Sequence, residues 1–168
     1  EYKYAWQHSS RSLEVKYLLA CFWEGQEGSF LLWSVWHCVL GLILIKTRKK
    51  WAAPVMTVVS LMQFALATMI AGIYFFCWKM GTNPFILLRD SGVLDNAPAL
   101  HINGDVTMGL RQDYMLSILD GNDLNPLLQN YWMVIHPPVL FMGFASTIIP
   151  FAFVIAGLWK KNFGEWTK

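Results

Sequence analysis

The sequence predicts an all-α integral membrane fragment, a bundle of three transmembrane helices with one long extracytoplasmic loop. Its 168 residues are 55% hydrophobic and only 14% charged, whereas about 25% of the residues of an ordinary soluble domain are charged. The apolar residues gather in three runs, 30–45, 55–78 and 139–159, that contain no Asp, Glu, Lys or Arg. Runs of this length and composition are typical of helices that cross a membrane.

The distribution of charge predicts how these helices are oriented. Positive residues follow the first and third runs: Lys46, Arg48, Lys49, Lys50, Lys160, Lys161 and Lys168. The segment between the second and third runs carries six Asp residues against three Lys and Arg residues. Because Lys and Arg are retained on the cytoplasmic side, we expect both basic ends to be cytoplasmic and the long loop to be extracytoplasmic. The first basic cluster suits lipid headgroups and is too short for a nucleic-acid surface.

These patterns divide the chain into seven parts. They are an extracytoplasmic segment with an amphipathic helix (1–28), a transmembrane helix (29–45), a cytoplasmic turn (46–53), a second transmembrane helix (54–78), an extracytoplasmic loop (79–138), a third transmembrane helix (139–159) and a cytoplasmic tail (160–168). The chain begins at Glu1 without a signal-peptide pattern. We therefore expect an interior piece of a longer polypeptide or one product of a split gene.

Two glycines interrupt the apolar pattern just before the first predicted span. In the segment WEGQEGS, Gly25 and Gly28 alternate with Glu24 and Glu27. One interpretation is a helix start, because negative charge is favoured in the first turn of a helix. The other is a tight turn packed against a ligand or a neighbouring helix, since glycine permits close approach.

Two polar side chains lie at membrane depth. His37 falls within the first predicted span, where an ionisable residue is a functional candidate. A neutral histidine can also satisfy its N–H within the protein, and this structural role is the interpretation that we prefer. Gln63 lies in the second predicted span, and we expect it to form a hydrogen bond between helices.

The long loop separates the second and third spans. Loops of this length are usually functional, and within this one the segment 111–119 fits either a short strand or a short helix. The loop closes with NPLLQNYWMVIHPP, in which we expect Asn125 to act as a cap and Pro126 to open a short helix.

His136 stands directly before two prolines at the boundary of the third span. A residue that precedes proline is disfavoured in the helical region, so we expect His136 to be extended and rigidly held by Pro137 and Pro138. An imidazole so placed, near Trp132 and Phe141, could ligate a metal or haem iron. The alternative is a histidine that caps the start of a helix.

Several of these segments carry a resemblance to a known family. WEGQEGSFLLW, GTNPF and DLNPLLQNYWMVIHPPVLFMGFASTIIPFAF, together with YAWQHSS near the start, resemble the N-terminal part of CcmF-type cytochrome c biogenesis proteins. That family groups with CcsA and CcmC among the haem-handling membrane proteins. The resemblance covers nearly the whole chain, except for the part of the loop between 81 and 122, and ends before the tryptophan-rich WWD segment of the family.

The resemblance implies a role in haem attachment. Family members receive haem b on the extracytoplasmic face of the bacterial inner membrane, or its organelle equivalent, and help to attach it to the CxxCH motif of apocytochrome c through thioether bonds. The histidine of the HPP element, here His136, would be one axial ligand of the iron. Pro137 and Pro138 would support it, and Trp132 and Phe141 are candidates for porphyrin contacts.

The resemblance also implies which partners the protein has and that these residues alone are insufficient for activity. Expected partners are the lipid bilayer, the remainder of a CcmF-type protein, a CcmE-type haem chaperone, and apocytochrome c with its thioreductase and chaperone subunits. The second axial histidine and the WWD segment of the family have no counterpart in these residues. The chain by itself is therefore not expected to be an active haem lyase (cytochrome c synthetase).

Two other functional classes compete with this one. A b-type haem subunit of a quinone oxidoreductase would be expected to carry two histidines within membrane spans, and only His37 is so placed. A structural or transport subunit without a cofactor would tolerate the loss of His136. The second axial ligand, the route by which haem reaches the site, and the role of His37 are left open.

Overall fold

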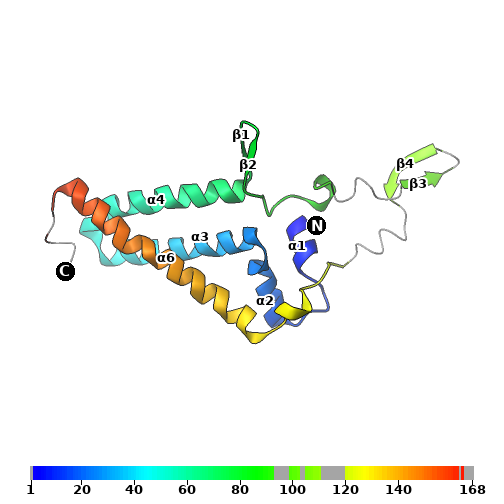
Figure 1. Cartoon of the computed structure of the whole chain (residues 1–168), viewed down its shortest axis with the longest axis horizontal. Helices are drawn as coiled ribbons and strands as arrows, with labels where there is room; N and C mark the ends of the chain where they lie inside the picture. The colour runs from blue at the N-terminus through cyan, green and yellow to red at the C-terminus, as the bar shows by residue number, and fades with distance from the viewer. Residues whose placement is uncertain (1, 93–98, 103–104, 111–119, 163, 165–168) are drawn as a thin grey trace.

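Three long helices dominate the computed structural model, which describes residues 2–92, 99–102, 105–110, 120–162 and 164. They are α3 (Gln26–Thr47), α4 (Lys49–Ala71) and α6 (Tyr131–Lys160), and all three pairs are in contact (Figure 1). Each is long and apolar enough to cross a membrane. The predicted all-α membrane bundle with three spanning helices is therefore confirmed, and the protein is an integral membrane protein.

The second long helix ends earlier than the apolar run that predicts it. Helix α4 stops at Ala71, and Gly72 follows with a left-handed φ of 68°, the usual geometry after a helix end. The chain then forms an antiparallel hairpin of β1 (Ile73–Phe75) and β2 (Trp78–Met80). A span of 54–78 was expected because the residues of this hairpin continue the apolar run.

The third long helix begins earlier than predicted, at Tyr131 instead of 139. The side chain of Asn130 caps it by accepting a hydrogen bond from the Met133 N–H, which satisfies a donor that a helix start otherwise leaves free. Just before it, the 3₁₀ helix η2 (Pro126–Leu128) opens with the Leu127 N–H donating to Oδ1 of Asn125 at 3.0 Å. The predicted cap and short helix at this position are thus confirmed.

Shorter elements lie around one end of the bundle. The N-terminal segment forms α1 (Lys3–His8) and α2 (Val15–Glu24), which sit at the end away from the C-terminus (Figure 1). The loop contains the 3₁₀ helix η1 (Leu88–Asp90) and a hairpin of β3 (Ala99–Ile102) with β4 (Asp105–Leu110). The segment 111–119, expected as strand or helix, lies outside the described residues.

The core lies where α4 and α6 cross. Buried side chains there come from all three long helices: Leu44, Trp51, Val55, Val58, Val59, Ile148, Ala152 and Ala156. Ala152 and Ala156 are fully buried, and small residues of this kind let membrane helices approach closely. At the same end, the Lys160 ammonium lies 4.9 Å from the centre of the Trp51 ring, so the two basic clusters of the sequence meet at one end of the bundle.

Helix α1 connects the two ends of the long loop. On one side the Lys3 N–H donates to the Ile86 carbonyl at 2.9 Å, and on the other the Asn122 N–H donates to the Trp6 carbonyl at 2.8 Å. The carboxylate of Asp120 also accepts a hydrogen bond from the Ser10 hydroxyl at 3.1 Å and one from the Arg11 backbone N–H at 2.9 Å. The segment leading into α6 is thereby tied to the N-terminal helices.

Candidate functional site

His136 lies in the second turn of α6, at the end of the bundle opposite to the basic clusters. Its side chain is exposed. Trp132 is four residues earlier, which places both side chains on the same face of the helix, and the indole is 70% exposed. The two rings line a shallow hollow of about 200 Å³, whose other lining residues are Leu128, Asn130, Met133 and Pro137. The imidazole of His136 and the indole of Trp132 therefore lie side by side near the start of α6.

The prediction that the two prolines hold His136 in an extended conformation is wrong, because α6 continues through Pro137 and Pro138. A proline inside a helix leaves the carbonyl four residues earlier without its donor, and membrane helices tolerate this when a neighbouring group replaces the donor. The indole N–H of Trp23, in α2, donates to the Met133 carbonyl at 2.9 Å. His136 is consequently held within a continuous helix.

Phe141 is placed differently from Trp132. Its ring centre lies 6.1 Å from that of Trp33 in α3 and 5.9 Å from that of Phe144. Phe141 therefore contributes to the contact between α3 and α6, whereas Trp132 is exposed and lines the hollow beside His136.

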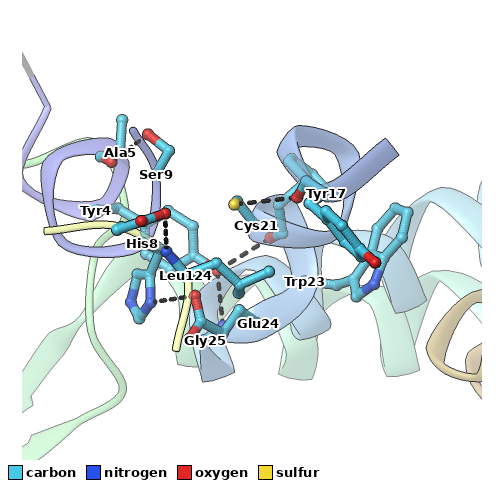
Figure 2. Close-up of polar contacts among 12 residues, drawn as sticks. Tyr4, Ala5, His8, Ser9, Tyr17, Cys21, Trp23, Glu24, Gly25 and Leu124 are labelled. Carbon is cyan, nitrogen blue, oxygen red and sulfur yellow. Dashed lines mark hydrogen bonds and ion pairs between the residues drawn. The ribbon is translucent and has the colours of Figure 1, made fainter. Parts of the chain in front are cut away.

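The turn at Gly25 and Gly28 is packed tightly against α1. Figure 2 shows Tyr4 and His8 reaching from α1 toward Gly25 and Glu24. The Tyr4 hydroxyl donates to the Phe22 carbonyl at 3.0 Å and accepts from the Gly25 N–H at 3.0 Å. A Cβ atom on Gly28 would lie 1.6 Å from the Phe22 carbonyl oxygen. The interpretation of this segment as a tight turn against a neighbouring helix is confirmed.

The same turn also begins a helix, as the first interpretation proposed. Helix α3 starts at Gln26, with Gly25 as its N-cap residue and Glu27 in its first turn. The two interpretations are therefore both correct. Sequence reasoning missed Tyr4 and His8, whose i, i+4 spacing was the one available signal that they share a helix face.

Burial and hydrogen bonds shift the pKa values of three groups in the N-terminal segment and the loop residues that contact it. Burial raises the pKa of Tyr4 to about 12, so its hydroxyl stays protonated and keeps both bonds. Burial likewise raises the pKa of the Cys21 thiol to about 11, which makes it an unreactive structural thiol. The backbone N–H groups of Arg11 and Gly121 hold the pKa of Asp120 below its usual range, so that carboxylate is ionised.

His37 has the structural partner that its depth requires. Its side chain is 3% exposed, and Nδ1 lies 3.2 Å from Oε1 of Gln63 in α4. The predicted hydrogen bond between helices is confirmed for Gln63. Across the described parts of the chain, no three His, Cys, Asp or Glu side chains meet in a cluster that could hold a metal ion.

Comparison with known proteins shows a family. Residues 23–167 match the family model described as cytochrome C assembly protein. The chain is 28% identical to the cytochrome c-type biogenesis protein CcmF of Pseudomonas fluorescens, over 98% of this chain and 22% of that protein. It is 29% identical to CcmF of Pseudomonas aeruginosa, over 95% of this chain and 21% of that protein.

A third relative, CcmF of Escherichia coli strain K12, is 28% identical over 92% of this chain and 20% of its own length. The chain thus spans about a fifth of the length of the curated relatives that it matches. No solved structure is significantly similar. Because the family model covers most of the chain and the relatives agree with it, this chain belongs to the cytochrome C assembly protein family, with the sequence of a CcmF-type cytochrome c biogenesis protein.

Proposed function

We propose that this chain presents His136 as one axial ligand to haem b during cytochrome c maturation, on the extracytoplasmic face of the membrane. The observation that supports this most directly is the pairing of an exposed imidazole with an exposed Trp132 indole around one hollow. The relatives are named as cytochrome c-type biogenesis proteins, which supports a role in cytochrome c maturation.

The residues that line the hollow are suited to contact one edge of a haem molecule. Neutral imidazole is a common axial ligand of haem iron, and a flat indole beside it offers an apolar surface for the porphyrin. A hollow of about 200 Å³ is smaller than the roughly 300–1,000 Å³ of a complete ligand pocket. The second axial ligand and most of the enclosing surface are therefore supplied by the rest of the full-length protein.

The chemistry served by this site is the addition of two thiols to two vinyl groups. In each addition a sulfur–carbon bond forms, the π bond of the vinyl group breaks, and the thiol proton is transferred to the terminal carbon, so no net oxidation occurs. The task of the protein is to hold reduced haem with its vinyl groups toward the CxxCH cysteines and to exclude water and oxygen, which is catalysis by position. A CcmE-type chaperone would deliver haem, and a thioreductase would keep the apocytochrome cysteines reduced.

The direct test is the haem content of the full-length protein. The His136→Ala variant, purified from membranes, should lose its haem, and imidazole supplied during purification should restore it. His8→Gln is the matched control, because His8 lies outside the hollow and glutamine can still donate to Glu24. An unchanged haem content in His136→Ala would overturn the assignment.

A further inference from the structure

We infer that Trp23 is a positioning residue for His136 and acts through the backbone carbonyl of Met133. The inference rests on the proposed role of His136 as a haem ligand and names the group that sets the geometry of that ligand. It connects the two most distinctive motifs of the chain, WEGQEG and HPP, which lie more than 100 residues apart in the sequence.

The argument begins with the helix backbone. In α6 the carbonyl of Met133 would normally accept a hydrogen bond from the N–H of residue 137. Residue 137 is proline and has no N–H. The indole Nε1 of Trp23 lies 2.9 Å from this carbonyl oxygen, so a side chain from α2 replaces the backbone donor that Pro137 removes.

The same arrangement occurs at a second proline in the molecule. Pro54 lies inside α4 and has no N–H to donate to the carbonyl of Lys50, four residues earlier. The ammonium of Lys160, at the end of α6, donates to this carbonyl at 2.9 Å. In both cases a carbonyl freed by proline becomes the point at which another helix is fastened, one at each end of the bundle.

The hydrogen bond from Trp23 to the Met133 carbonyl affects the haem site because Met133 lies close to His136 in α6. Met133 follows Trp132 directly and precedes His136 by three residues, so it lies in the turn that carries both rings of the hollow. Fixing its carbonyl fixes the direction in which α6 leaves the membrane boundary. Without that bond, the helix turn before Pro137 loses a tie to the rest of the protein, and the imidazole is no longer held at one place.

Trp23 is itself held in place by the tight turn. The Ser29 hydroxyl donates to the Trp23 carbonyl at 2.9 Å, and the Tyr4 hydroxyl donates to the carbonyl of the preceding residue. The bonds therefore form a continuous path from α1, through the turn, to the start of α6. This path explains why the glycine turn stands next to Trp23.

The experiment uses a conservative variant and a second-site change that replaces the missing donor. Trp23→Phe keeps an aromatic ring and removes the N–H. In full-length protein in lipid nanodiscs we expect about tenfold weaker haem binding, the effect of one carbonyl left without a partner. Hydrogen exchange of the backbone around residues 131–141, measured without haem, should become faster.

Pro137→Ala supplies a backbone N–H that can donate to Met133 in the ordinary helical way. In the Pro137→Ala background, Trp23→Phe should change haem affinity and hydrogen exchange less than about twofold, because the indole donor is then redundant. Equal losses in the two backgrounds, or unchanged hydrogen exchange in Trp23→Phe alone, would overturn the inference.

The outcome for His136→Ala separates this inference from the function on which it rests. If that variant loses haem while Trp23→Phe retains full affinity, the inference is wrong and the proposed function stands. If His136→Ala retains haem, the proposed function is wrong, and the positioning role falls with it even when hydrogen exchange confirms the bond.

Discussion

Nδ1 of His37 and Oε1 of Gln63 lie 3.2 Å apart and join α3 to α4 within their apolar length. With the amide oxygen of Gln63 as the acceptor, Nδ1 of His37 donates this hydrogen bond. In hydrocarbon, a polar group without a partner is costly. The pair therefore serves to fix the register of the two helices that meet at Arg48.

The His37 and Gln63 pair gives a stability prediction. Gln63→Leu should lower the free energy of unfolding by about 1 kcal/mol, the usual size of a hydrogen bond between membrane helices. The double variant His37→Leu with Gln63→Leu should recover most of this loss, because no buried donor is then left unpaired. Unfolding in mixed micelles with increasing denaturing detergent measures both. Equal or additive losses would contradict the interpretation.

The close packing around Gly28 predicts that one added methyl group at this residue strongly lowers the stability of the protein. Gly28→Ala should destabilise the protein by about 3 kcal/mol, as overpacking does at its upper range, because the added Cβ would meet the backbone of Phe22. Gly143→Ala in α6 is the matched control, since a Cβ there has nothing within 4 Å. The melting temperature of each variant provides the measurement, and similar values for the two would refute the packing argument.

Tyr4 predicts a loss of stability at high pH. Burial raises its pKa from 10.0 to about 12 in the folded protein, so the folded state holds the proton more tightly than the unfolded state. The stability that this provides is complete below pH 10 and is lost as the pH rises toward 12. Tyr4→Phe should be less stable at neutral pH, having lost two hydrogen bonds, and its stability should fall less steeply over that range. Detergent unfolding of both proteins at several pH values tests the difference, and parallel curves would contradict it.

The orientation in the membrane is tested by labelling. In a background without native cysteines, Lys49→Cys at the basic turn and Asn122→Cys near α1 should react from opposite sides of the membrane. An impermeant maleimide applied to intact cells should reach only position 122. Labelling of both positions from outside would overturn the predicted topology and, with it, the face assigned to His136.

The features that the sequence predicts well are those set by the membrane or by neighbouring residues. The three spans follow from the length of apolar runs, and the cap at Asn125 follows from local backbone geometry. The hydrogen bond of Gln63 between helices was predicted because a lone amide at depth needs a partner, although the partner, His37, was not named. Each of these arguments uses only residues that lie close together in the chain.

The features that it predicts poorly depend on contacts between distant residues. His136 was expected to be extended because the rule for residues before proline considers only neighbours. The donor that replaces the missing N–H of Pro137 comes from Trp23 in α2. The end of α4 at Ala71 was missed because hydropathy continues past it. The tight approach of Tyr4 to Gly28 likewise joins segments with no shared local pattern.

The part of the loop between η1 and Asp120 is flanked by two backbone hydrogen bonds to α1, one at Ile86 and the other at Asn122. Because the entropy of closing a loop rises only slowly with its length, residues can be added or removed between these anchors with little effect on the site at α6. Changes in the length of this segment should therefore leave the hollow around Trp132 and His136 unchanged. The same property makes it the natural place to insert an affinity handle or a fluorescent reporter into a working protein.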